Sequence, residues 1–160
     1  MKTSMRRASI AVIVSMGCYA PPAAPASTAL ISAIELRRVQ DGWAMQPDYT
    51  VVLRADGSAH YVGRWGVPML GPYSARIDSA AFRKLAEHAI RVGFFALNDE
   101  YTAGITDEST TFTTITAGKR VKRVSNYAYS GPAELRTLED AVALAAARLV
   151  WRSDAGTDGQ

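Results

Sequence analysis

Four carboxylates lie close together in the segment from Asp99 to Glu108, which also contains Tyr101 and Thr106. Glu100 and Asp107 are the pair best suited to chemistry, because paired carboxylates can transfer protons or bind a hard cation. Their spacing does not match the D-x-[DN]-x-[DN]-G pattern of a calcium loop. A solvated loop in which Asp107 hydrogen-bonds its own backbone explains the same residues.

The other residue types that could support catalysis are scattered along the sequence. Histidine titrates near neutrality, but His60 and His88 fall on different predicted elements and have no metal-binding spacing. Ser125 and Ser130 have no G-x-S-x-G setting. We therefore predict no catalytic residue, no metal site and no cofactor.

Two further stretches have the composition of contact surfaces. The segment from Trp65 to Pro72 contains two glycines and two prolines, and Trp65, Met69 and Leu70 form either a binding patch or a cover for one end of the core. Lys119 to Arg123 is a cationic run, suited to an anionic lipid or phosphate, or to a solvated edge strand. The candidate binding residues are Trp65, Met69, Tyr101, Thr106 and Asp107.

The first 17 residues are typical of a signal peptide. Lys2, Arg6 and Arg7 form a positive region, and the apolar run from Ala8 to Met16 that follows is too short to span a bilayer. Residues 18–32 are rich in Pro, Ala and Ser, which predicts a flexible spacer. The leader thus predicts an exported protein of the cell envelope.

Two processing sites compete within this region. Ser15-Met16-Gly17-Cys18 resembles a bacterial lipobox, so Cys18 is the expected lipid attachment site of a lipoprotein that faces the periplasm from a membrane such as the outer membrane. The alternative is cleavage after Ala26, in an A-x-A pattern, which would release a soluble periplasmic or secreted protein. Cys18 is the only cysteine, so no intramolecular disulfide can form.

Removal of the leader changes the charge of the chain. The formal net charge of +3 includes Lys2, Arg6 and Arg7, so the chain from Cys18 onward has 15 basic residues (18 − 3) and 15 acidic ones. Nucleic-acid binding requires a net basic face. We therefore do not expect a nucleic-acid partner.

Residues 33–152 are long enough for one domain, followed by a polar tail at 153–160 that we expect to be disordered. Two hairpins are predicted, with turns at Asp56-Gly57 and Ala117-Gly118. Strands are expected over 34–39, 49–54, 59–64, 110–116 and 119–124, with a short strand or extended segment over 73–77.

Two amphipathic helices complete the predicted domain. Asp78 or Ser79 caps the first helix and Gly93 ends it, whereas Gly131-Pro132 opens the second. The fold class is therefore α+β, a two-layer domain with a mostly antiparallel sheet of about five strands and two helices packed on one face.

Several short motifs in this order resemble a bacterial family with no assigned activity, domain of unknown function 6438, found largely in exported proteins and lipoproteins. The resemblance covers residues 33 to 151 and is most specific at Tyr101 to Asp107. It is also carried by Pro47-Asp48-Tyr49, Asp56-Gly57, Tyr61-Val62-Gly63, Gly93-Phe94-Phe95-Ala96-Leu97 and Gly131-Pro132 with Leu135. Members of the family often have a cysteine pair before the P-x-Y element, which this chain lacks.

Three functions are compatible with these features. The first is a non-catalytic, lipid-anchored envelope module that binds another macromolecule, such as an envelope protein, through the loops at Trp65–Pro72 and Asp99–Glu108. The second is a small ligand-binding or hydrolytic domain that uses Glu100 and Asp107, with His60. The third, a purely structural envelope lipoprotein, has the same sequence features as the first.

Overall fold

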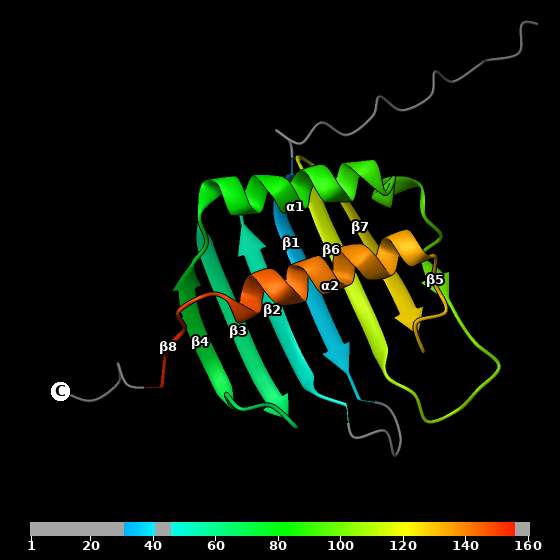
Figure 1. Cartoon of the computed structure of the whole chain (residues 1–160), viewed down its shortest axis with the longest axis horizontal. Helices are drawn as coiled ribbons and strands as arrows, with labels where there is room; N and C mark the ends of the chain where they lie inside the picture. Colours follow the sequence, from blue (N-terminus) through cyan, green and yellow to red (C-terminus); the bar gives the residue numbers. More distant parts are fainter. Residues whose placement is uncertain (1–30, 41–45, 156–160) are drawn as a thin grey trace, which may run out of the picture.

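The computed structural model describes residues 31–40 and 46–155 (Figure 1). The predictions for the leader, for Cys18, for Ala26 and for the spacer up to residue 30 lie outside these ranges.

One sheet of eight strands forms the frame of the domain, in the order β5-β7-β6-β1-β2-β3-β4-β8. All neighbouring strands are antiparallel except β5 and β7, which are parallel. The strands are β1 (Ile31–Val39), β2 (Asp48–Arg54), β3 (Ser58–Trp65), β4 (Gly71–Arg76), β5 (Glu100–Tyr101), β6 (Thr110–Ala117), β7 (Arg120–Tyr127) and β8 (Arg152–Ser153).

The α+β class is confirmed, but the prediction of about five strands was wrong. The two outermost strands, β5 and β8, contain two residues each, too few for any alternation of polar and apolar residues to be visible in the sequence. The domain also reaches further than the predicted strands at both ends. Strand β1 begins at Ile31, within the segment assigned to the spacer, and Ser153 of the assigned tail pairs with Tyr73.

Both hairpin turns form where the sequence predicts them. Gly57 has a φ of 83° and Gly118 a φ of 59°, values that glycine adopts without strain. The carboxylate of Asp56 accepts a hydrogen bond of 2.8 Å from the backbone N–H of Ser58, which fixes the first turn.

Helix α1 (Ser79–Arg91) is bounded by the predicted signals. Asp78 is its N-cap and accepts hydrogen bonds from the backbone N–H groups of Ala80 (2.8 Å) and Ala81 (3.2 Å). Gly93, with a φ of 63°, turns the chain into the short 3-10 helix η2 (Phe94–Ala96). Helix α2 (Ala133–Ala147) starts one residue later than predicted, because Pro132 is its N-cap rather than its first helical residue.

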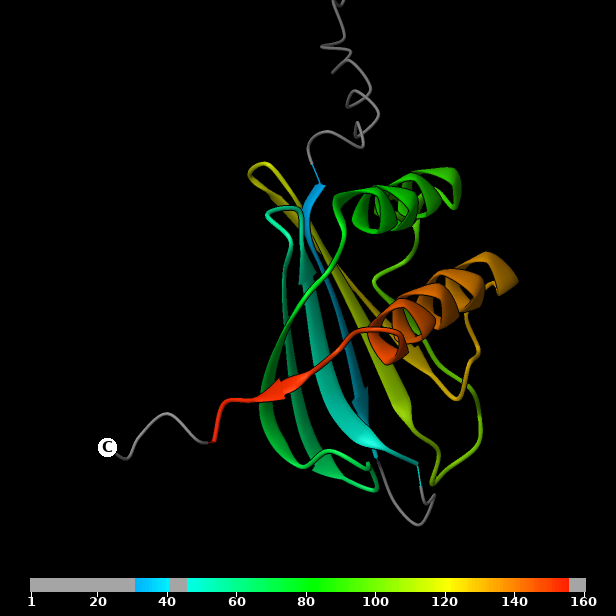
Figure 2. The ribbon, with the colours of Figure 1, turned by 60° about the vertical axis from the view of Figure 1, so that its left-hand side comes forward.

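The two helices cover the sheet unequally. Figure 2 shows both on the same side of the sheet, and Figure 1 shows α2 crossing the strands while α1 lies along the strand ends. Helix α1 starts there because the chain enters it directly from the end of β4. The expected packing of two helices on one face is therefore too simple a description of α1.

A single core fills the space between the sheet and the helices. Alternate strand residues such as Ile34, Leu36, Val51 and Leu53 are fully buried, as expected for one face of a pleated sheet. Phe82, Leu85, Ala89, Leu135, Leu138 and Val142 contribute from the helices.

Gly63 on β3 determines the course of the following loop. A Cβ atom at this position would lie 1.9 Å from the carbonyl oxygen of Met69 and 2.8 Å from Cγ2 of Val67. The loop can thus fold back against β3 only because Gly63 has no side chain. This close approach gives a physical reason for glycine in the Tyr61-Val62-Gly63 motif.

We predict that Gly63→Ala lowers the free energy of unfolding by about 2–4 kcal/mol, because a backbone carbonyl must move to relieve the clash. The measurement is urea unfolding followed by circular dichroism. Gly104→Ala is the control, since nothing lies within 4 Å of a Cβ atom there. Equal midpoints for the two variants would contradict this account of the loop.

Candidate functional site

A cleft of about 320 Å³ lies between the loop that follows β3 and the C-terminal half of α2. We call it the aromatic cleft. Its lining residues are Pro47, Tyr49, Tyr61, Gly66, Val67, Pro68, Met69, Ala143, Ala146, Ala147 and Trp151. The volume and the apolar walls are those of a small binding pocket.

Tyr61 is the centre of the aromatic side chains. Its ring stacks on Tyr49 with centroids 5.6 Å apart, and Trp151 lies 5.6 Å away at a tilt of 49°. Tyr73 packs edge-on at 6.2 Å. The indole N–H of Trp151 donates a 3.0 Å hydrogen bond to the carbonyl of Ala146, which fixes the ring against α2. The floor of the cleft is therefore a pre-ordered surface.

The hydroxyl groups of Tyr49 and Tyr61 give the cleft polar atoms. Neither hydroxyl hydrogen-bonds another residue within the described part of the chain, and neither is among its fully enclosed unpaired atoms. Burial raises the pKa of both phenols. They remain neutral at physiological pH and can each donate a hydrogen bond to a bound acceptor.

A buried polar cluster lies beneath the same helix. Glu139 on α2 is fully buried, and its carboxylate accepts hydrogen bonds from the side-chain amide of Asn126 (3.0 Å) and the hydroxyl of Thr113 (3.4 Å). Arg38 lies nearby and forms an ion pair of 3.6 Å with Asp140. Helix α2 is thus bound to the sheet by polar contacts as well as apolar ones.

Asn126 also fixes the turn that leads into α2. Its side-chain oxygen accepts a 2.8 Å hydrogen bond from the backbone N–H of Gly131. In the turn itself, Ala128 and Tyr129 have φ values of 52° and 54°. This left-handed conformation costs about 1–2 kcal/mol per non-glycine residue. The hydrogen bond between Asn126 and Gly131 therefore helps to offset the strain of the turn.

The environment of Glu139 changes its acidity. Burial raises the pKa of this carboxyl to about 7, against the opposing effects of the Asn126 amide, the Arg38 guanidinium and the Thr113 hydroxyl. Glu139 therefore changes protonation close to physiological pH inside the core.

The structure places Met69 in the wall of the aromatic cleft and Trp65 beside it, at the end of β3. The side chain of Trp65 is 44 % exposed and that of Leu70 is 64 % exposed. Met69 thus packs against the core, as a core cover would, whereas Trp65 and Leu70 face solvent, and their role in a binding patch stays a prediction.

The remaining predicted binding residues lie elsewhere. Tyr101 on β5 packs against the core, and its hydroxyl accepts a 3.1 Å hydrogen bond from the backbone of Asn98. Thr106 and Asp107 are exposed, and the Thr106 hydroxyl donates to the Asp107 carboxylate (3.3 Å). Five strand spacings separate β5 from β3, about 24 Å along the sheet, so the two predicted groups are not one site.

The histidines occupy separate surfaces. On the side of the sheet away from the helices, the Ser74 hydroxyl lies 3.4 Å from Nδ1 of His60 and donates a 2.9 Å hydrogen bond to Asp154. The serine proton is thus directed to the carboxylate, whereas a catalytic triad directs it to the histidine. His88 lies 3.3 Å from the Thr137 hydroxyl, where α1 meets α2.

A larger hollow of about 700 Å³ lies at the β8 edge of the sheet, between β4, β8 and the end of α2. Arg76, Arg148 and Arg152 line it together with Asp78 and Asp154. Asp78 caps α1 and Asp154 accepts from Ser74, so both carboxylates already have partners. We prefer the aromatic cleft because it combines apolar walls with two tyrosine hydroxyls that make no hydrogen bond to the described residues.

The buried polar cluster and the role of the tyrosines in the cleft were not predicted from the sequence. Glu139 follows Leu135 by four residues, so a carboxylate within the apolar stripe of α2 was the available signal. Tyr49 and Tyr61 lie on different predicted strands. In the sheet Tyr61 is paired with Val51, which is two residues from Tyr49 on the same face of β2, and this register brings the two rings together.

The comparison with protein families identifies the chain. Residues 46–146 match the family model named domain of unknown function 6438. The chain belongs to this family. The match contains the strands and loop of the aromatic cleft and most of α2, and the resemblance expected from the short motifs is confirmed. Among curated proteins, none matches the chain.

No helix in the ranges 31–40 and 46–155 is long and apolar enough to cross a bilayer.

We predict that the folded protein loses stability as the pH rises from about 4.5 to about 7. In that window the unfolded chain has released the Glu139 proton, at its ordinary pKa of 4.5, while the folded chain retains it up to a pKa of about 7. The unfolding free energy therefore falls with pH and levels off above 7. The whole effect is about 3 kcal/mol. Glu139→Gln should flatten this slope in chemical unfolding measured across the pH range.

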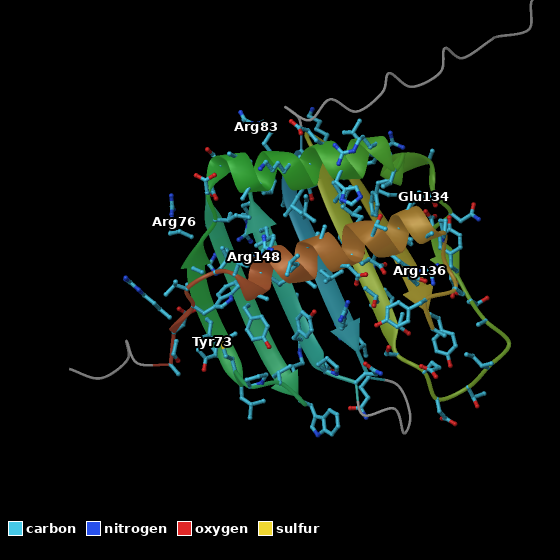
Figure 3. All side chains as sticks on the ribbon, in the orientation of Figure 1. Tyr73, Arg76, Arg83, Glu134, Arg136 and Arg148 are labelled. Carbon is cyan, nitrogen blue, oxygen red and sulfur yellow. The ribbon has the colours of Figure 1, made fainter. Side chains whose placement is uncertain are left out.

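Glu134→Gln is the matched control, because Glu134 lies on the same helix but is exposed (Figure 3). It should leave the pH slope unchanged. An unaltered slope in Glu139→Gln would show that Glu139 is ionised in the folded protein throughout this range.

Proposed function

We propose that this protein is an exported, lipid-anchored cell-envelope module that binds another envelope macromolecule without catalysing a reaction. The observation that carries the proposal is the aromatic cleft, which is lined by Tyr49 and Tyr61. The exposed Trp65 is the residue directly before the lining residue Gly66. Aromatic residues that combine an apolar body with a polar tip are typical of protein contact surfaces.

The chemistry of the cleft indicates the kind of segment that would occupy it. The apolar walls favour one apolar side chain, and the hydroxyls of Tyr49 and Tyr61 would donate to backbone carbonyl groups of the partner. Trp65 and Leu70 would extend the contact beyond the cleft, since both are exposed beside it. We therefore propose an extended segment of an envelope protein as the partner.

A binding role agrees with the chemistry of these side chains. Burial raises the pKa of both cleft tyrosines, so neither is a good general base at neutral pH. The ordered aromatic floor would lower the entropic cost of binding.

The cellular location in this proposal is supported by the leader and by Cys18 alone. A lipid on Cys18 and the spacer that follows would tether the domain and raise its concentration near a membrane-associated partner. Processing after Ala26 would instead give a soluble periplasmic or secreted form of the same binding module.

A small-ligand or hydrolytic function is the second candidate. It is favoured by the exposure of the Glu100 and Asp107 side chains, which leaves both carboxylates accessible to a ligand. Asp107→Asn tests it, and an intact fold with every cellular phenotype retained would remove its best residue.

We predict that Trp65→Ala combined with Tyr61→Phe weakens capture of the partner at least tenfold without unfolding the domain. Loss of a buried aromatic contact and of a hydrogen bond together costs at least about 2 kcal/mol of binding free energy. The measurement is in-cell cross-linking of the tagged full-length protein, quantified by mass spectrometry.

Leu144→Ala is the matched control, since Leu144 is 53 % exposed on α2 and does not line the cleft. Equal capture by wild type, control and double variant would contradict the assignment of this surface. The same sample reports whether the mature chain begins at a lipidated Cys18 or at Ser27.

A further inference from the structure

The charged residues are distributed unevenly between the two ends of the sheet. One end of the sheet is where the chain enters β1. We call it the attachment end. It contains Ile31, which starts β1 and pairs with Ala117 just before the β6–β7 turn. The β2–β3 turn and the last residue of β4 lie at the same end, because Ala33 pairs with Arg54 and Ser58 pairs with Arg76.

Helix α1 extends the attachment end. It begins at Ser79, two residues after Ile77, and Figure 1 shows it lying along the ends of the strands. Arg83, Lys84 and Arg91 of this helix are exposed. Figure 3 shows Arg83 on the side of α1 that points away from α2.

The attachment end has a net positive charge. Its seven cations outnumber its three carboxylates, which gives 7 − 3 = +4. The carboxylates of Asp56 and Asp78 are hydrogen-bonded to adjacent backbone N–H groups in a turn and a helix cap. The cations are Arg54, Arg76, Arg83, Lys84, Arg91, Lys119 and Arg120, and the carboxylates are Asp56, Asp78 and Glu87.

The rest of the described chain has the opposite balance. Eight cations and ten carboxylates remain, which gives 8 − 10 = −2. Asp48, Asp107 and Glu108 are among these carboxylates and lie toward the far end of the sheet, where β2 and β6 begin. The nine residues of β1 set the two ends about 26 Å apart, well beyond a Debye length of about 8–10 Å. A charged surface near one end is therefore screened from the charges at the other end.

We propose that the attachment end is a membrane-facing surface that lies against anionic phospholipid headgroups. The inference rests on the proposed lipid anchor, since the spacer joins the domain at this end. Clustered lysines and arginines are attracted to anionic bilayers, each with about 1 kcal/mol when it lies near the surface. The same orientation directs the aromatic cleft, at the opposite end of β2 and β3, toward a partner.

Vesicle flotation of the full chain tests the proposal independently of the anchor. Cys18→Ser removes lipidation, and the vesicles are phosphatidylcholine with or without about 30 % phosphatidylglycerol, enough to give an anionic surface. Arg83→Gln with Lys84→Gln is the test variant. Arg64→Gln with Arg136→Gln is the control, because it makes the same charge change at exposed positions on β3 and α2, and Figure 3 shows Arg136 on α2.

The expected result is a 20- to 30-fold loss of partition into the anionic vesicles for the test pair, which is about 1 kcal/mol for each cation. The control pair should lose less than about threefold, and the difference should vanish at 1 M salt, where the Debye length is about 3 Å. Far-ultraviolet circular dichroism of each variant verifies folding.

Equal losses for the two pairs would overturn the proposal, since binding would then follow net charge alone. Competition by inorganic phosphate beyond that of chloride at equal ionic strength would also overturn it, because it would reveal a discrete phosphate site. The mass of the wild-type N-terminal peptide reports lipidation of Cys18 separately, so failure of the anchor and failure of this surface are distinguishable.

Discussion

The side chain of Asn126 is the interaction on which the arrangement of the candidate site depends. Its amide donates to the buried Glu139 carboxylate and its oxygen accepts from the N–H of Gly131, so one residue joins β7, the strained turn and α2. Together with the buried apolar residues of α2, these bonds set the direction of the helix across the sheet. Ala143 and Ala146, which form a wall of the aromatic cleft, depend on that direction.

The two ends of the domain differ in the chemistry of their surfaces. At one end the chain joins the sheet, and the hairpin turns and α1 present cations. At the other, the close approach of Met69 to Gly63 folds the apolar loop beside the tyrosines. The antiparallel sheet separates these surfaces by the length of its strands, so each can contact a different partner without electrostatic interference.

The sequence predicted those parts of the fold that local chemistry determines. Asp56-Gly57 specifies a hairpin turn by itself, and Asp78 and Gly93 specify the ends of α1 through caps made by neighbouring residues. The two-residue strands β5 and β8 were not predicted, because they form only by pairing with the neighbouring strands β7 and β4. The cleft was not predicted either, because only the tertiary fold brings together its residues from β2, β3, the adjoining loop and the end of α2. A charge within an apolar helix stripe, as at Glu139, is the one local sign of a buried partner.

We propose that the cleft end meets a protein partner while the attachment end faces lipid. Photo-cross-linking in living cells, with a photoreactive residue placed at Trp65 and separately at Lys119, tests it most directly. We expect one dominant protein adduct from position 65 and lipid adducts from position 119. Protein adducts from position 119 with none from position 65 would contradict it, because the binding surface would then be at the end assigned to the membrane.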